Sequence, residues 1–356
     1  MISQNAIRHA EKCRFCWMCR HLCPIQHQTG KELNTPRAKG LLLSMVNKGT
    51  QSFDKDMATA MYECLLCDAC TNDCATGYQP PLFIREARTE AVTNELAPAP
   101  VMEMIEKALE SGNVYGVEKP SFAQDGTDVL VYIGDVAAVK VPEMAKSFLK
   151  LLAKAGVSAK VLAQEPSSGM MLADLIGYTQ EVADQAKVCA AAINEAGLPV
   201  VVLDSYDAEI MKQKYPEFGC ELHQDITTAT AYVAKLLEEG KLAPKAANGI
   251  PGACHDDDRL ARTFHEFAPI RAMAKAAGYH VGEMFNREKL AKSCGTAVAY
   301  GYMPEMIVKV AGGRWADLLR TENTAMLVAN PQAYLCLGLC VPEGYELVDL
   351  FAALVD

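Results

Sequence analysis

The pattern of apolar and polar residues divides the chain into a helical first part and an alternating remainder. Residues 35–49 and 82–96 carry apolar side chains at helical spacing. In the first segment Thr35 can cap the helix and Pro36 suits its first turn. We therefore predict a helix in each segment, within a helical domain that ends at the prolines near residue 100.

From residue 127 onwards, short apolar runs alternate with alanine-rich helical ones. Residues 128–134, 157–164 and 198–205 have the length and composition of strands, whereas residues 141–156 and 183–197 have helical spacing. Strands that alternate with helices are typical of α/β proteins. This part of the chain is therefore predicted to be α/β.

The α/β part contains a weak internal repeat. Residues 148–169 are echoed by residues 270–295, and the strand at 198–205 is echoed by residues 323–331. Such internal similarity predicts two tandem α/β units, at about 127–246 and 247–356.

Composition narrows the class of protein. The chain has 356 residues, 50% of them hydrophobic, and a net charge of -10, which is typical of a globular protein of two or three domains. Without a long basic run, we expect no nucleic-acid partner. Apolar runs such as 129–134 are far shorter than the roughly 20 residues of a membrane span, so no integral membrane segment is expected. Residues 1–13 lack the apolar centre of a secretory signal, and a cytoplasmic location is predicted.

Cysteine spacing supplies the strongest chemical signal. Eight of the 14 cysteines lie in two runs, CRFCWMCRHLCP at 13–24 and CLLCDACTNDC at 64–74, with identical spacing. Three cysteines at intervals of three, followed by a fourth after three more residues, form the bacterial ferredoxin signature for 4Fe-4S cubes. Two 4Fe-4S clusters are therefore predicted. A pair of zinc knuckles, or buried free thiols, remains the alternative.

The ligands of each cube follow from the same pattern. In two-cluster ferredoxins the fourth cysteine of one run ligates the other cluster. The first cluster is therefore predicted to bind Cys13, Cys16, Cys19 and Cys74. The second cluster is predicted to bind Cys64, Cys67, Cys70 and Cys23.

Nearly the whole chain resembles a known family of iron–sulfur proteins. The family comprises the iron–sulfur subunits of heterodisulfide reductase (D and B types), of glycolate oxidase and of anaerobic glycerol-3-phosphate dehydrogenase. Besides the two cysteine runs, TPRAKG at 35–40 matches the family closely and PLFIREAR at 81–88 matches it loosely. The family carries a Cys-Cys-Gly motif in each repeat, and EPSSG at 165–169 and KSCG at 292–295 fall at those places.

The resemblance implies a fold with three parts. It is α/β, with an N-terminal helical two-cluster ferredoxin-like domain followed by two degenerate Cys-Cys-Gly-type α/β repeats. The expected boundaries are 1–100, 127–246 and 247–356.

The departures from the family bear on function. Segments 255–262 and 328–331 look like two further ligand segments of the family. Serine, aspartate or asparagine replaces cysteine at five family positions: Ser167, Ser168, Asp258, Ser293 and Asn330. Serine and asparagine are poor ligands for iron–sulfur centres, and only Cys294 survives. The resemblance therefore implies that the additional noncubane clusters are absent and that the repeats are a docking scaffold.

The other candidate residues receive simpler interpretations. The remaining cysteines, at 189, 220, 254, 336 and 340, are predicted to fill apolar core sites. A third metal site at Cys254, Cys294, Cys336 and Cys340 is the alternative. His223 is interpreted as a capping or core residue. The segment from His255 to Asp258 is interpreted as a solvated loop at a helix start.

The predicted function is that of an electron-transfer subunit without its own substrate site. It would relay single electrons between a flavoprotein dehydrogenase, holding FAD or FMN, and a second acceptor. Two other classes remain open: a thiol or disulfide reductase-like enzyme with a degenerate site near Cys294, and a redox or iron sensor.

Charge near the two runs leads to a hypothesis about direction. Basic side chains flank the first run, namely Arg8, Lys12, Arg14 and Arg20, with His9 and His21 nearby. Glu63, Asp68 and Asp73 surround the second run. Because reduction adds negative charge, the first cluster is predicted to have the higher potential and to accept electrons from the second. The alternative is that these residues are merely a solvated surface.

Overall fold

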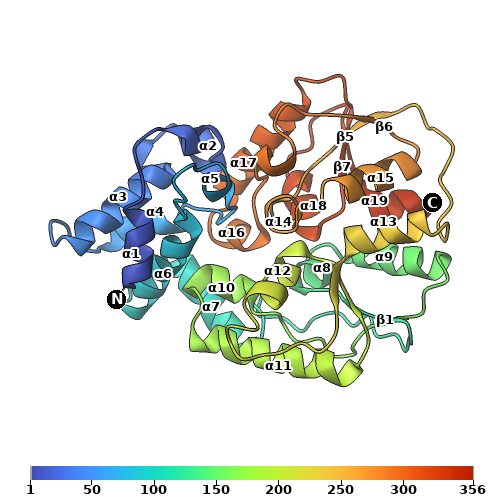
Figure 1. The fold of residues 1–356 in the computed structure, drawn as a ribbon, viewed down its shortest axis with the longest axis horizontal. Coiled ribbons are helices and arrows are strands. Elements are labelled where there is room, and N and C mark those ends of the chain that lie inside the picture. The colour runs from blue at the N-terminus through green and yellow to red at the C-terminus, as the bar shows by residue number, and fades with distance from the viewer. Residues whose placement is uncertain (1, 356) are drawn as a thin grey trace.

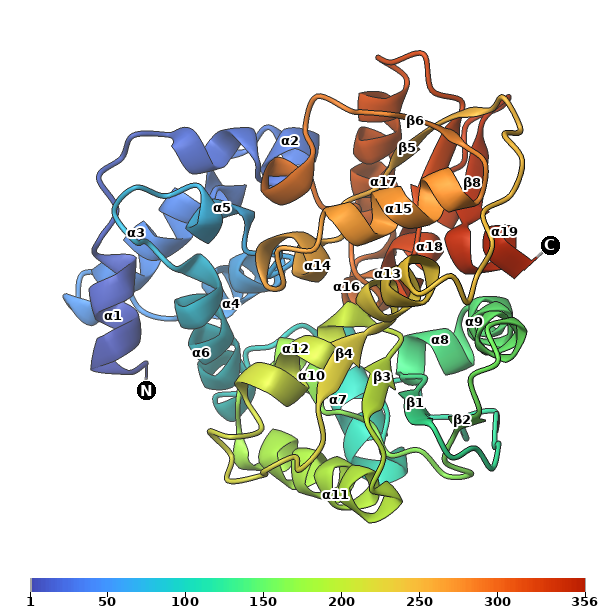
Figure 2. The same cartoon turned by 45° about the vertical axis from the view of Figure 1, so that its right-hand side comes forward.

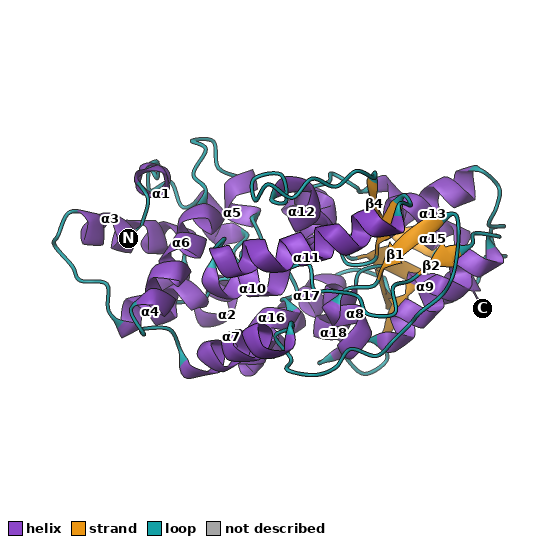
Figure 3. Ribbon diagram, turned by 90° about the horizontal axis from the view of Figure 1, so that it is seen from below, coloured by secondary structure: helices purple, strands orange, loops and turns teal. Residues whose placement is uncertain are grey.

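The computed structural model describes residues 2–355 and consists of a helical part and two α/β parts. In Figure 1 the helical part, in blue, lies at one end, and the α/β parts, green and orange, lie one above the other at the opposite end. Figure 3 shows the strands gathered away from the N-terminal helices. The predicted α/β class is confirmed.

The first part is built from seven α-helices and two 3-10 helices among the described residues. They are α1 (Gln4–Ala10), η1 (Met18–His21), α2 (Pro24–Thr29), η2 (Glu32–Asn34), α3 (Pro36–Asn47), α4 (Lys55–Tyr62), α5 (Ala69–Asn72), α6 (Pro80–Thr93) and α7 (Ala99–Ser111). As predicted, Thr35 caps α3 by accepting a hydrogen bond from the amide of Ala38, and Pro36 occupies its first turn. The predicted helix at 82–96 is α6, which begins two residues earlier. Leu43, Met61 and Phe83 are fully buried between these helices.

The first sheet has four parallel strands in the order β2-β1-β3-β4. Its elements are β1 (Val129–Tyr132), α8 (Asp135–Val139), α9 (Pro142–Lys154), β2 (Ala159–Lys160), α10 (Met170–Ile176), α11 (Gln180–Ala196), β3 (Val200–Val202), α12 (Ser205–Gln213), β4 (Ile226–Thr228) and α13 (Ala229–Glu238). Val131 pairs with Val201 at its centre, and both are buried. Strands covered on both faces carry continuous apolar runs, as seen here.

The second sheet has the same kind of order, β6-β5-β7-β8, and is also parallel. Its elements are β5 (Pro251–Cys254), α14 (Asp258–Arg262), α15 (Ala268–Ala276), β6 (His280–Gly282), η3 (Glu288–Leu290), α16 (Ala297–Tyr302), α17 (Pro304–Leu318), β7 (Ala325–Val328), α18 (Pro331–Gly338), β8 (Glu346–Asp349) and α19 (Leu350–Val355). Figure 2 shows this sheet above the first one.

The two α/β parts pack through two pairs of helices. Helix α9 packs against α19, and α13 packs against α15. The ammonium group of Lys154 donates hydrogen bonds of 3.0 Å and 2.7 Å to the carbonyl oxygens of Leu354 and Val355. Helix α2 of the first part packs against α17, and α6 packs against α10. The first part therefore contacts both α/β parts.

Candidate metal centre

The two cysteine runs fold into loops with the same unusual backbone. In the first run Phe15 and Trp17 have positive φ angles of 56° and 70°. The residues at the same places in the second run, Leu66 and Asp68, have φ angles of 52° and 63°. Such conformations cost side chains other than glycine on the order of 1 kcal/mol each. The repetition of both therefore indicates that each loop is shaped around the same kind of centre.

Each loop also directs a backbone amide at its first sulfur. The amide of Phe15 donates to Cys13 Sγ at 3.4 Å, and the amide of Leu66 donates to Cys64 Sγ at 3.4 Å. Amide donors of this kind stabilise a negatively charged sulfur. These contacts suit thiolates better than neutral thiols.

Four cysteines from both runs line one small cavity. Cys64, Cys67 and Cys70 of the second run lie around it together with Cys23, the last cysteine of the first run. Pro24, Asn34 and Ile84 are among the other residues of its wall. This set of sulfurs is the one predicted from the sequence for the second cluster, and soft thiol donors suit iron.

Cys74 lies beside the start of the first run. Its sulfur is 3.2 Å from the Thr76 hydroxyl, which in turn donates to the carbonyl oxygen of Lys12, next to Cys13, at 3.1 Å. Burial raises the pKa of Cys74, but hydrogen bonds from Thr76 and from the amides of Tyr78 and Gly77 outweigh it, so the net pKa is lowered. Cys74 is thus linked through Thr76 to the start of the first run, and its hydrogen bonds favour the ionised form of its thiol.

The remaining sulfurs crowd one another. Burial, with the charges of neighbouring thiolates, raises the pKa of Cys19 to about 12 and that of Cys23 to about 11. The pKa of Cys70 is raised well above its usual value by burial and then by Cys67, Cys64 and Cys23. The ionised form of these buried, neighbouring thiols would be stabilised by a cationic centre between them.

Three buried arginines hold the second run through its backbone. Arg88 donates to the carbonyl oxygen of Cys64 at 2.6 Å, Arg259 to that of Leu66 at 2.9 Å, and Arg262 to that of Cys67 at 2.7 Å. All three side chains are buried. Sequence reasoning missed them because no local pattern links them to the run, although Arg88 falls in the noted segment 81–88 and the other two fall in 255–262.

The five positions that the resemblance aligned with family cysteines hold hydrogen-bonded polar groups. Four of them donate to aspartates: Ser167 to Asp135 at 2.6 Å, Ser168 to Asp207 at 2.5 Å, Ser293 to Asp258 at 2.6 Å and Asn330 to Asp204 at 3.3 Å. The fifth, Asp258, pairs with Arg262 at 2.6 Å. Each of these five side chains is therefore engaged in a hydrogen bond or ion pair within the protein.

The prediction of a solvated loop at 255–258 is wrong. His255 and the three aspartates after it are between 2% and 4% exposed, because serine, tyrosine and arginine side chains from distant elements enclose them. The predicted helix start is confirmed, since Asp257 caps α14 by accepting from the amides of Arg259 and Leu260. Burial raises the pKa of Asp257 to about 7 and that of Asp204 to about 6.

The other cysteines and His223 give a mixed result. Four cysteines predicted for the core are buried, Cys189, Cys220, Cys254 and Cys336, but Cys340 is partly exposed. His223 is exposed, so its core interpretation is wrong. Among residues 2–355, no three His, Cys, Asp or Glu side chains are arranged to hold a single metal ion.

Comparisons with known proteins agree with this geometry. Residues 9–78 match the family model of the 4Fe-4S dicluster domain. The chain is 26% identical over 218 residues to the EtfAB:quinone oxidoreductase of Syntrophomonas wolfei, covering 59% of this chain and 30% of that protein. It is 26% identical over 210 residues to the probable iron-sulfur-binding oxidoreductase FadF of Bacillus subtilis, covering 57% and 28%. The predicted resemblance to iron–sulfur subunits of oxidoreductases is confirmed.

A third relative covers more of the chain. This probable membrane-anchored ferredoxin of Chromohalobacter salexigens is 22% identical over 344 residues, 88% of this chain and 50% of that protein. The chain thus spans half or less of the length of these relatives. In the part that the structure describes, no helix combines the length and apolar character needed to cross a membrane.

One solved structure shares the fold. The crystal structure of a hypothetical protein from Helicobacter pylori superposes with a TM-score of 0.58 at 12% identity, covering 98% of this chain and 72% of that one. The arrangement of a helical part with two parallel sheets is therefore not confined to this chain.

Proposed function

We propose that this chain is an electron-transfer subunit that holds two 4Fe-4S clusters and relays single electrons between redox partners. The observation that carries the proposal is the cavity lined by Cys64, Cys67, Cys70 and Cys23. When bound, 4Fe-4S clusters supply one-electron redox chemistry, while the protein sets their spacing, shielding and potential.

The proposed ligand sets exchange one cysteine between the runs. Cys23 lies with the second run in the shared cavity, which supports its role as fourth ligand of the second cluster. Cys74 is tied through Thr76 to Lys12 at the edge of the first run, which supports its role with Cys13, Cys16 and Cys19. Such an exchange would hold the two clusters side by side, which suits a relay.

We propose that the two α/β parts, about 127–246 and 247–356, are repeats retained as a scaffold. The capping residues of α12 and α18, Asp204 and Asn330, hydrogen-bond to each other across the interface of the two parts. Together with the equal strand orders, this supports an origin from a common unit. Hydrogen-bonded serine and aspartate side chains in place of thiolates support the view that these parts hold no further cluster.

The partners are proposed to be a flavoprotein dehydrogenase and a second electron acceptor. One relative is named as an oxidoreductase between EtfAB and quinone, which supports a role between two redox partners. The alternative of a thiol enzyme near Cys294 has less support. Cys294 is 3% exposed, and burial raises the pKa of its thiol well above the usual value, so it is poorly placed to act as a nucleophile.

Anaerobic copurification followed by rapid mixing tests the proposal. The tagged chain is isolated with the proteins that accompany it, and the flavin of the accompanying protein is then reduced with its own substrate. The proposal predicts that the visible absorbance of oxidised clusters bleaches as the flavin reoxidises. Turnover of a substrate by the isolated chain would contradict the proposal in favour of an enzyme, and cluster-dependent binding without electron transfer would favour a sensor.

A further inference from the structure

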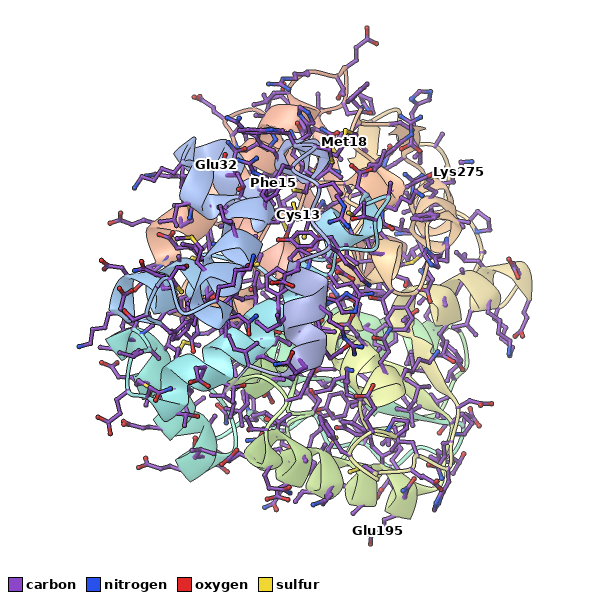
Figure 4. All side chains as sticks on the ribbon, turned by 60° about the vertical axis from the view of Figure 1, so that its left-hand side comes forward. Cys13, Phe15, Met18, Glu32, Glu195 and Lys275 are labelled. Carbon is purple, nitrogen blue, oxygen red and sulfur yellow. The ribbon has the colours of Figure 1, made fainter. Side chains whose placement is uncertain are left out.

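The loop of the first run presents large apolar side chains to solvent. Phe15 is 49% exposed, Trp17 is 42% exposed and Met18 is 51% exposed, and Cys16 between them is itself exposed. Figure 4 labels Phe15 and Met18 close to Cys13 on the side turned to the viewer. Exposed apolar side chains that gather around a reactive centre are typical of interaction sites.

The loop of the second run can be compared directly with that of the first, because the two loops have the same backbone conformation. At the places of Phe15 and Met18 it carries Leu66 and Ala69, which are each 1% exposed. Helix α14 packs against α5 and covers this loop. Of the two equivalent loops, therefore, the first is left open to solvent while the second is enclosed.

Two aromatic residues occupy positions where the backbone favours other residues. Both Phe15 and Trp17 have positive φ, a conformation for which glycine or asparagine is better suited. The second run has a leucine and an aspartate there. The aromatic side chains at positions 15 and 17 are therefore not a requirement of the loop backbone.

Positive charge surrounds the aromatic pair. The guanidinium of Arg37 lies 4.0 Å from the ring centroid of Trp17 and 5.3 Å from that of Phe15, and Arg20 lies 5.3 Å from Trp17. Arg14 is exposed next to Phe15. Two exposed acids lie nearby: Glu32 pairs with Arg37 at 2.6 Å, and the carbonyl oxygen of Glu11 accepts a hydrogen bond from Arg14 at 3.2 Å. In a chain with a net charge of -10, this patch is locally basic.

We propose that Phe15, Trp17 and Met18, ringed by Arg14, Arg20 and Arg37, form the docking surface for an acidic one-electron redox protein. This inference rests on the proposed function. The partner loses one electron and the cluster of the first run gains it, or the reverse, and no bond is made or broken. The apolar centre excludes water at the contact, while the arginine ring attracts and orients an acidic surface. Electrons therefore enter or leave at the first cluster, and the second cluster is the inner one.

A flavodoxin, a small acidic FMN protein, is the probe for this surface. Its binding in the oxidised state to anaerobically purified chain is measured by isothermal titration at low and high salt. The test variant carries Trp17→Asn and Met18→Asn, since asparagine tolerates the positive φ of residue 17. The control is Phe285→Asn, because Phe285 is 91% exposed and is not part of the patch.

The proposal predicts that the test variant binds the probe at least about tenfold more weakly, whereas the control binds within about twofold of the unmodified chain. Binding of the unmodified chain weakens at high salt. Iron content and the rate of reduction by dithionite stay unchanged in both variants. Reduction by flavodoxin hydroquinone is slowed in the test variant and unchanged in the control.

The outcomes separate this inference from the proposed function. Equal affinity of the test variant and the unmodified chain, or no binding by either, overturns the docking surface. Equal weakening by the Phe285 control overturns it as well. Selective weakening in a chain that holds no iron supports the surface and contradicts the proposed function.

Discussion

The guanidinium of Arg262 donates a hydrogen bond of 2.7 Å to the carbonyl oxygen of Cys67, 195 residues away in the sequence. With Arg88 and Arg259, it places three buried positive charges against the second run. The three guanidinium groups are buried, whereas Glu63, Asp68 and Asp73 are only partly buried, so the arginine charges are screened less and favour the reduced cluster, even though Asp258 pairs with Arg262 and Glu209 pairs with Arg259. We therefore reverse the order expected from sequence charge alone and predict that the second cluster has the higher potential.

Replacement of Arg262 tests this expectation. Arg262→Gln removes a buried positive charge and should lower the potential of the second cluster by on the order of 50 mV, with little effect on the first. Arg262→Lys keeps the charge and should shift it less. The measurement is a redox titration followed by electron paramagnetic resonance.

The matched control is Arg320→Gln, because the side chain of Arg320 is 76% exposed. It should shift neither potential. If Arg262→Gln also leaves both potentials in place, the buried arginines do not set the order of the two clusters.

Exchange of ligands between the runs makes a second prediction. Cys74→Ala should perturb the same spectroscopic centre as Cys16→Ala, because both serve the first cluster in the proposed sets. Cys23→Ala should likewise perturb the same centre as Cys67→Ala. Low-temperature spectra of the four reduced variants decide this. Pairing of Cys74 with Cys67, or of Cys23 with Cys16, would show that each run binds its own cluster.

Cys294 provides a test of the proposal that the α/β parts hold no cluster. Cys294 is buried. The next residue, Gly295, lies close to Cys336 of α18, since a Cβ atom added to Gly295 would be 3.4 Å from Cys336 Sγ. Cys294→Ala should leave iron content and both spectra intact and should cost about 1 kcal/mol of stability through lost packing. Loss of iron in this variant would instead reveal a third metal site.

The buried aspartates predict a dependence of stability on pH. Burial raises the native pKa of Asp204 to about 6 and of Asp257 to about 7, above their value in the unfolded chain. Between about pH 4 and pH 7 the native protein therefore binds more protons than the unfolded chain, so stability falls as pH rises. Anaerobic melting temperatures should be lower at pH 8 than at pH 5.5.

Asp257→Asn removes one of these titrations while keeping an oxygen that can cap α14. From pH 5.5 to pH 8, the melting temperature of this variant should fall less than that of the unmodified chain. Asp184→Asn is the control, because Asp184 is exposed and its pKa is lowered by Lys187 and Gln180, so it titrates below this range. An unchanged pH dependence in Asp257→Asn would assign the effect to other groups.

Local sequence patterns predicted the cysteine-rich segment and several helix starts. Features that depend on contacts between residues far apart in the sequence could not be predicted. The cysteine spacing identified the dicluster segment, and Thr35 with Pro36 located the start of α3. Spacing within a run carries no information about what covers it, so the exposure of Phe15 and the burial of Leu66 were not predictable. Three consecutive aspartates looked solvated because their serine, tyrosine and arginine partners come from elsewhere in the chain.

Iron and acid-labile sulfide in anaerobically purified protein show most directly whether the chain holds two cubes. Clusters held by the eight cysteines of the two runs predict about eight iron and about eight sulfide per chain. Double replacement of Cys13 and Cys16 by alanine should halve both values. Zinc in place of iron would contradict the proposed function as a whole, and about twelve iron or more would contradict the claim that the α/β parts hold no cluster.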